Sequence, residues 1–489
     1  MRKPFLLLFL LLPLCAAAQK VAPFKGGDRV AFVGNSITDG GHYHSYIWLY
    51  YMTRFPEARM QMYNCGIGGD TSLEILRRID HDVFAKRPTV LTLTFGMNDS
   101  GYFEYNGDNP GAFADSKVAE SRRNFLEIEK KLKEHTSVRK VMIGTSPYDQ
   151  TSRFNDNIFK GKNDAMRRII AFQDSAARAN GWEFVDFNSP MCAINSRFQA
   201  ADSTFTLCGS DRVHPDNDGH MVMAWLFLKA QGMEGKKVAE VAVDASRSKV
   251  MTASGCKVTR LKTEDGRLSF DYLARALPYP LDTIAHGWGC TRPQSRITQI
   301  VPEFMDEMNS ELLTVSGLSG KHLLTIDGEP IDTLTAGELA SGVNLAAYRH
   351  TPQYRQAMAV MALNEERWEI ERRFRDYAWL QYNFFMKRGM LEANDEKAAR
   401  AFREGQKSDG WVAAKRDLYG RMIHKDVRDM YTRQMDMIVD RIYEINRPQK
   451  RRIELVAVEY GQEKRDMRTD TPLRWCTCLM SRLPYGYAA

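Results

Sequence analysis

Two polar blocks, far apart in the sequence, carry the residue types needed to activate a serine as a nucleophile. Ser36 stands in the segment Gly-Asn-Ser-Ile directly after an apolar run, and His214 lies three residues after Asp211 in the segment Asp-Arg-Val-His-Pro. A serine hydroxyl is a weak nucleophile until a base removes its proton, and an imidazole titrates in the right range to do so. A carboxylate on the second ring nitrogen sets the tautomer and stabilises the imidazolium. A serine at a helix start is more often an N-cap, so the prediction of a nucleophile needs further residues.

Two more blocks offer groups that stabilise negative charge on oxygen. Gly69 stands in the segment Gly-Gly-Asp, and Asn98 stands in the segment Gly-Met-Asn-Asp. Glycines let a backbone N–H approach a ligand closely, and an asparagine amide is a fixed hydrogen-bond donor. Each block alone is ordinary turn chemistry. Their occurrence after successive apolar runs, together with Ser36 and His214, favours an active site.

The first half of the chain has the pattern of an α/β fold that can position these groups. Short β-rich runs alternate with longer helical patterns between residues 29 and 235, which is typical of a parallel sheet. The expected strands are Arg29–Val33, Gln61–Asn64, Thr89–Phe95, Val138–Gly144 and Glu183–Asp186. The expected helices are Tyr43–Met52, Ser72–Phe84, Lys117–Glu134, Lys162–Ala179 and Asn217–Ala230. Because these strands are apolar with little alternation, we expect a three-layer sandwich with a five-stranded sheet covered on both faces.

The second half has a different pattern. Short strands at Val238–Val243, Leu268–Ala274, Leu312–Val315 and Leu323–Ile326 predict a β-rich accessory module over residues 236–350. Two helical stripes in residues 351–448 predict the core of a helical hairpin. A strand at Ile453–Val458 in the final segment, 449–489, makes that hairpin an insertion in the β module.

The four polar blocks together resemble those of the SGNH hydrolase superfamily, also called GDSL-like esterases and lipases, over residues 28–229. The resemblance implies a flavodoxin-like catalytic domain at 25–235 and a mechanism without a metal or an organic cofactor. The implied catalytic residues are Ser36 as nucleophile, His214 as general base and Asp211 as its partner, and the implied oxyanion donors are the backbone N–H groups of Ser36 and Gly69 and the side chain of Asn98. The family's Gly-Asp-Ser-Leu is Gly-Asn-Ser-Ile here, so Asn35 replaces an acid beside the nucleophile. That change removes no member of the catalytic triad, and its effect on the reaction rate stays open.

The N-terminus predicts export. Residues 1–18 have a basic start, an apolar run at Phe5–Leu14 and small residues at 16–18, as a signal peptide does. Cys15 leaves a lipid-anchored form as a less favoured alternative, because the residue before it is bulkier than lipidation sites prefer. We therefore expect a periplasmic or secreted protein without stable membrane insertion.

The composition and the cysteines bear on possible nucleic-acid partners, disulfides and zinc sites. The 68 basic and 61 acidic residues are interspersed, with a net charge of +7, so we expect no nucleic-acid partner. Cys192 and Cys208 bracket the approach to His214 and are candidates for a disulfide. Cys476 and Cys478 lack the second ligand pair of a zinc site.

The substrate is the least determined property. Tyr102, Phe103 and Tyr105 follow Asn98 in a loop rich in small polar residues, a good place for substrate contacts. Exported SGNH enzymes with added β modules often act on decorated carbohydrates, so we favour a carbohydrate O-acetylesterase or similar deacylase acting on a small-molecule or polysaccharide ester. A lysophospholipase or lipase-type esterase is one alternative. An inactive core with a glycan- or partner-binding second half is the other, and the oligomeric state is open.

Overall fold

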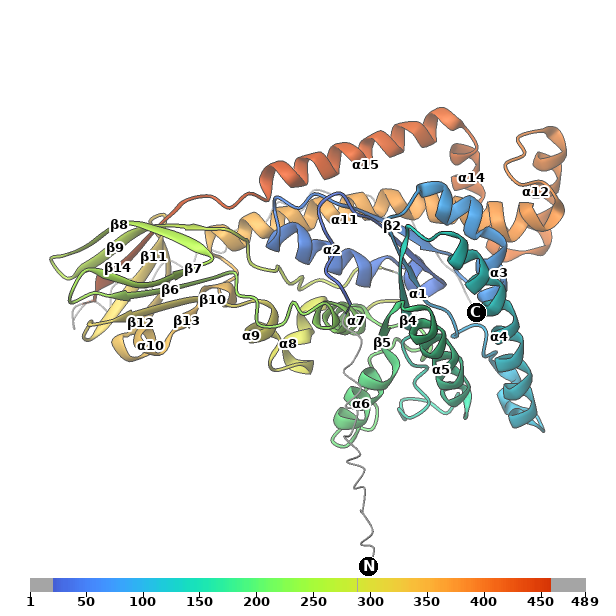
Figure 1. Cartoon of the computed structure of the whole chain (residues 1–489), viewed down its shortest axis with the longest axis horizontal. Helices are drawn as coiled ribbons and strands as arrows, with labels where there is room; N and C mark the ends of the chain where they lie inside the picture. Colours follow the sequence, from blue (N-terminus) through green and yellow to red (C-terminus); the bar gives the residue numbers. More distant parts are fainter. Residues whose placement is uncertain (1–20, 288, 459–489) are drawn as a thin grey trace, which may run out of the picture.

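The computed structural model describes residues 21–287 and 289–458. A five-stranded parallel sheet in the order β2-β1-β3-β4-β5 forms the centre of the N-terminal part (Figure 1). Its strands are β1 (Arg29–Gly34), β2 (Gln61–Gly66), β3 (Val90–Leu93), β4 (Arg139–Gly144) and β5 (Glu183–Asp186). In β1, Phe32 enters one apolar core and Val33 the opposite one. The predicted α/β sandwich with five parallel strands is confirmed.

Helices cover both faces of this sheet. Those that contribute to the core containing Phe32 include α2 (His42–Arg54), α6 (Asn188–Gln199) and α7 (Asn217–Ala230). Those that contribute to the opposite core include α3 (Ser72–Arg78), α4 (Pro110–Glu134) and α5 (Lys162–Asn180). The sequence patterns missed α6 and the short α1 (Ser36–Asp39), and they ran α3 on to Phe84, whereas a π-helical turn at Ile79–Val83 and a 3-10 turn at Phe84–Lys86 end it. Helix α1 and the two irregular turns have too few residues for a clear helical period.

Two further sheets pack face to face around a second apolar centre. One has the order β13-β10-β6-β7 and the other β12-β11-β14-β9-β8. Their strands are β6 (Ala239–Asp244), β7 (Lys249–Ser254), β8 (Cys256–Glu264), β9 (Arg267–Ala274), β10 (Glu311–Ser316), β11 (Lys321–Ile326), β12 (Glu329–Thr335), β13 (Val343–Asn344) and β14 (Arg451–Ala457). The short helices α8 (Ile297–Ile300), α9 (Phe304–Met308) and α10 (Ala336–Ser341) lie between them in sequence. The sequence missed β7, β8 and β12, because these strands are mostly exposed and carry few apolar residues, and it missed β13, which has only two residues.

A helical segment leaves this β module and returns to it. It begins with α11 (Pro352–Trp379), capped by Thr351, whose hydroxyl accepts a hydrogen bond from the Tyr354 N–H. Helix α15 (Lys425–Ile445) packs back along α11, and β14 then pairs antiparallel with β9 and β11 (Figure 1). The prediction of a simple hairpin was incomplete, because α12 (Glu396–Ser408), α13 (Gly410–Ala414) and α14 (Arg416–Met422) lie between the two long helices.

Two further expectations can be compared with the described residues. In residues 21–287 and 289–458, no helix is long and apolar enough to cross a membrane. The suggested Cys192–Cys208 disulfide is wrong: both thiols are free. Cys192 lies on α6, whereas Cys208 lies in a β-bridge with Pro215 and directs its thiol to the Pro147 carbonyl at 3.8 Å. The predicted signal peptide, Cys15, Cys476 and Cys478 lie outside the described residues.

Candidate active site

Ser36 lies at the carboxyl edge of the sheet, where β1 ends and α1 begins. Asn35 is the N-cap of α1, and its Oδ1 accepts a hydrogen bond from the Ile37 N–H at 3.1 Å. The first N–H groups of a helix have no partner within it, so the Ser36 N–H is available at this edge. Asn35, the residue that departs from the family pattern, therefore has a structural role, because it caps the turn that presents the serine.

The structure brings Ser36, His214 and Asp211 into one hydrogen-bonded chain. His214 Nε2 lies 2.8 Å from Ser36 Oγ, and His214 Nδ1 is in contact with Asp211 Oδ2. Asp211 Oδ1 accepts the backbone N–H groups of Val213 at 2.9 Å and of His214 at 3.0 Å. One carboxylate thus orients the imidazole and folds the turn that carries it.

The carboxylate of this chain is held in its charged form. Burial alone would raise the pKa of Asp211, but the hydrogen bond from the His214 ring, the ring's charge and the two backbone N–H groups outweigh burial, so the pKa is lowered. An ionised Asp211 is the form that orients a histidine base.

Arg212, between the two, holds the turn in place. Its φ of 64° lies in the left-handed region, which is uncommon for a residue with a side chain. The buried guanidinium donates to the carbonyls of Asp149 at 3.1 Å, Ser152 at 2.8 Å and Asn155 at 2.6 Å. These hydrogen bonds hold the backbone between Asp211 and His214 in this conformation. No pattern in the sequence indicates this role of Arg212.

The expected oxyanion donors follow β2 and β3 at the same edge. Gly69 has a φ of 85°, and a Cβ there would meet nothing within 4 Å. Glycine is therefore required by the backbone conformation and not by crowding. Within the described part of the chain, nothing accepts a hydrogen bond from the Gly69 N–H. Asn98 Nδ2 donates to the Asp70 carbonyl at 2.9 Å, which joins the two donor loops.

Tyr102 sets the orientation of the Asn98 amide. Its hydroxyl donates to Asn98 Oδ1 at 2.6 Å, so the NH₂ group must face away from Tyr102. One hydrogen of that group goes to the Asp70 carbonyl, and the other has no acceptor among the described residues. Of the aromatic residues expected to contact substrate, Tyr105 is instead buried and donates to the Ser100 carbonyl at 2.9 Å, whereas the Phe103 side chain is 78% exposed.

Helix α11 and the turn after it reach the Gly69 loop, a contact that the sequence did not reveal. Arg375 Nε donates to the Gly66 carbonyl at 2.8 Å and Trp379 Nε1 to the Gly68 carbonyl at 3.1 Å. Beyond α11, Asn383 Nδ2 donates to Asp70 Oδ1 at 3.2 Å. The stripe of apolar residues predicted the helix, but no local signal showed that its polar residues would hold a loop more than three hundred positions earlier.

A buried network of ion pairs also contacts the Gly69 loop. Asp82 contacts Arg375 through two hydrogen bonds, at 2.9 and 2.8 Å, and Arg78 at 2.6 Å. Arg78 also pairs with Asp70 at 2.6 Å and donates to the Gly34 carbonyl at 3.1 Å. Burial opposes the charge on Asp82, but Arg375 and its other basic neighbours hold its pKa well below the usual range. The network links the ends of β1 and β2 to the helical segment.

Three other histidines near Ser36 are buried and packed among aromatic rings. His42 lies with its ring centroid 4.9 Å from that of Trp368 and 5.1 Å from that of His220. Burial lowers the pKa of His42 to about 3 and that of His44 to about 4. These rings are therefore neutral and have a structural role.

Known proteins match two parts of the chain. Residues 32–222 match the GDSL-like Lipase/Acylhydrolase family, and residues 358–447 match the Diltiazem deacetylase C-terminal helical domain. The solved structure of a gut microbial diltiazem-metabolizing enzyme is 53% identical, with a TM-score of 0.89, and the match covers 90% of this chain and 100% of that one. The chain belongs to the SGNH hydrolase superfamily. It is an enzyme that hydrolyses ester bonds.

A second relative matches less than half of this SGNH hydrolase. An acetylxylan esterase from Geobacillus stearothermophilus is 25% identical over 228 residues, which are 42% of this chain and 95% of that protein. The helical segment that holds the Gly69 loop lies in the region that matches the deacetylase helical domain.

Proposed function

We propose that this SGNH hydrolase is an exported serine esterase that removes acetyl groups from a carbohydrate or another small molecule through an acyl-serine intermediate. The proposal is carried by the contact of 2.8 Å between His214 Nε2 and Ser36 Oγ, with Asp211 on the other ring nitrogen. This arrangement lets the ring take the serine proton as the oxygen attacks.

The reaction then follows from the geometry. Ser36 Oγ attacks the ester carbonyl while its proton moves to His214 Nε2. The oxyanion accepts hydrogen bonds from the Ser36 and Gly69 N–H groups and from Asn98 Nδ2. Collapse of the intermediate breaks the ester C–O bond, and His214 returns the proton to the departing alcohol. A water molecule, deprotonated by His214, attacks the acyl-serine and releases the acid and the free serine.

Two observations support an acetyl ester on a ring-bearing alcohol. The matching proteins are an acetylxylan esterase and, by family name, a diltiazem deacetylase. Beside the Gly69 loop, Trp379 stacks on Trp411 at a centroid distance of 6.3 Å, and the Trp411 side chain is 69% exposed. An exposed indole next to an oxyanion loop offers a flat face for a sugar or an aromatic ring.

The nucleophile is tested by covalent labelling. We expect a fluorophosphonate probe to label the wild type and the surface control Ser189→Ala, but not Ser36→Ala. Ser189 is exposed on α6, away from the described triad contacts. Equal labelling of Ser36→Ala and the wild type would show that another residue reacts.

The substrate class is tested by comparing esters that differ in one part. We expect p-nitrophenyl acetate to be cleaved faster than p-nitrophenyl octanoate. We also expect acetate to be released from acetylated xylo-oligosaccharides or from diltiazem. Trp411→Ala should raise the KM for acetylated xylo-oligosaccharides and for diltiazem and leave kcat for p-nitrophenyl acetate unchanged. A clear preference for octanoate would favour the lipid-directed alternative instead.

Export rests on the sequence of residues 1–18. We expect the full chain, expressed in a bacterium, to lose this segment and to be recovered outside the cytoplasm, with the mature chain beginning at Gln19 by mass spectrometry. A diacylated chain beginning at Cys15 would instead establish the lipid-anchored form.

A further inference from the structure

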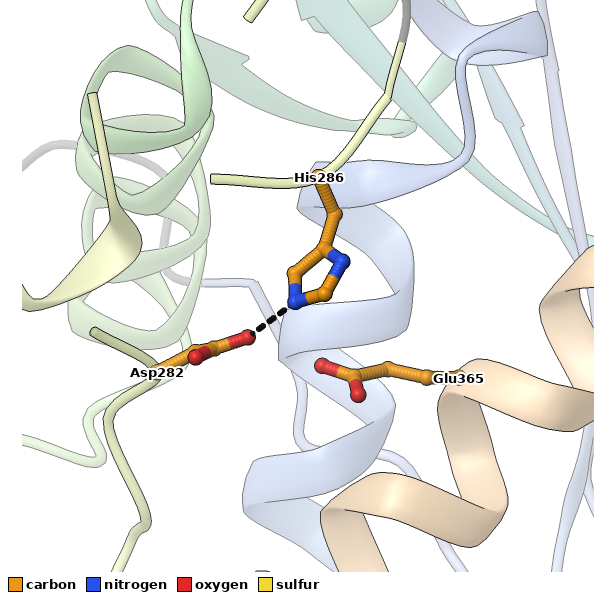
Figure 2. Close-up of side chains that lie close together, drawn as sticks. All are labelled: Asp282, His286 and Glu365. Atoms are coloured by element: carbon orange, nitrogen blue, oxygen red, sulfur yellow. Dashed lines mark ion pairs between the residues drawn. The ribbon is translucent and has the colours of Figure 1, made fainter. Parts of the chain in front are cut away.

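Among the described residues, one group of metal-ligating side chains outside the triad lies where two segments of the chain meet. Asp282 and His286 belong to the loop that follows β9, and Glu365 belongs to α11. One ligand atom from each of the three lies within 4.8 Å of the others, and His286 Nε2 is 2.7 Å from Asp282 Oδ2. Figure 2 shows the three side chains directed toward one another across the space between the loop and the helix.

The two loop residues are held from behind. Asp282 Oδ1 accepts the Ile284 N–H at 2.8 Å, which leaves Oδ2 toward the cluster. His286 is fixed by its backbone, because its N–H donates to Asn217 Oδ1 at 2.7 Å and its carbonyl accepts Asn217 Nδ2 at 2.9 Å. Outer contacts of this kind orient the ligands in metal sites.

The cluster borders a cavity of about 170 Å³ whose chemistry is anionic. Glu365, Glu366 and Glu369 line it, and no lysine or arginine is among its lining residues in the described chain. Trp368 also lines it. Its side chain is buried, and its Nε1 has no hydrogen-bond acceptor among the described residues. Glu369 lies 3.7 Å from Arg372, so the carboxylates of Glu365 and Glu366 are the ones that favour a cation there.

We propose that Asp282, His286 and Glu365 bind a divalent transition-metal ion, with zinc the best fit. One imidazole with two carboxylates suits zinc and its neighbours, whereas calcium and magnesium prefer oxygen ligands alone. Binding replaces the proton shared between His286 Nε2 and Asp282, and that proton leaves to solvent or moves to Nδ1. Water completes the coordination from the cavity.

The ion would act as a clamp and not as a reactant. It would join α11 to the loop of His286, and that loop is bonded through Asn217 to the start of α7, three residues after His214. The helical segment would then be tied both to the Gly69 loop and to the segment that carries the catalytic histidine. This inference does not depend on which ester the enzyme hydrolyses.

The test uses the full mature protein, stripped of metal with a chelator and dialysed. We expect it to take up zinc at this site, with a rise in Tm, and to show the d–d absorption of a nitrogen and oxygen site when cobalt replaces zinc. His286→Ala and Glu365→Gln should each weaken zinc binding more than about tenfold and abolish the rise in Tm. Glu369→Gln, which lines the same cavity outside the cluster, is the matched control and should bind like the wild type.

Each result decides the proposal. Zinc affinity, rise in Tm and cobalt spectrum that are the same in the wild type, His286→Ala and Glu365→Gln would overturn it, as would no binding by the wild type. A thiolate charge-transfer band with cobalt that survives both substitutions would place the metal at cysteines instead. Ester hydrolysis is not needed for any of these readouts, so they are independent of the catalytic proposal.

Discussion

Replacing Tyr102 by phenylalanine should slow the enzyme only through Asn98. The substitution removes the hydroxyl that donates to Asn98 Oδ1 at 2.6 Å and leaves the ring in place. A lost hydrogen bond between neutral groups is worth about 1 kcal/mol, which corresponds to about a fivefold fall in kcat for p-nitrophenyl acetate. Asn98→Ala removes the donor itself and should lower kcat by about 100-fold or more.

The double variant Tyr102→Phe/Asn98→Ala tests whether Tyr102 acts through Asn98. If Tyr102 acts by orienting the Asn98 amide, adding Tyr102→Phe to Asn98→Ala should change kcat by less than about twofold, a coupling of about 1 kcal/mol. Tyr105→Phe is the matched control, because its hydroxyl bonds the Ser100 carbonyl in the same loop and does not contact Asn98. A further fivefold loss in the double variant would refute the positioning role and indicate that Tyr102 acts on the substrate directly.

Three further substitutions probe the support of the site. Arg375→Met leaves buried Asp82 without two of its hydrogen bonds and should lower the free energy of unfolding by about 3 kcal/mol or more; a loss below about 1 kcal/mol in urea titrations would contradict the network's importance. Trp379→Phe removes the 3.1 Å bond to the Gly68 carbonyl and should lower kcat about two- to tenfold with little change in KM; steady-state kinetics with an unchanged kcat would argue against it. Burial raises the pKa of Asp39 to about 6, so the folded state binds a proton more tightly than the unfolded state and loses stability as pH rises through that value. Asp39→Asn lacks this penalty, and its Tm relative to the wild type should be higher at about pH 8 than at about pH 5; an equal difference at both would show that Asp39 does not titrate there.

The placement of the candidate catalytic groups could be predicted from the sequence because each group is presented locally. Ser36, Gly69 and Asn98 each follow a parallel strand, and parallel strands bring their carboxyl ends to one edge. The short Asp-x-x-His spacing lets one turn place Asp211 on the ring of His214, as the structure shows. Asn35 was the visible departure, and its role as a cap is also local.

The residues that hold the site in place could not be predicted from the sequence, because they act through contacts between distant segments. The pattern along α11 predicted a helix, but not that Arg375 and Trp379 would bond carbonyls of the Gly69 loop. Nor did it show that Glu365 would meet Asp282 and His286. Exposed strands such as β8 were missed for a related reason, since their pairing partners and not their own residues define them. The amino-acid sequence by itself determined the strand-and-turn units and the reactive groups at their ends. Only the tertiary structure decided which remote side chains hold those groups still, because hydrogen bonds and ion pairs between segments leave no periodicity in the chain.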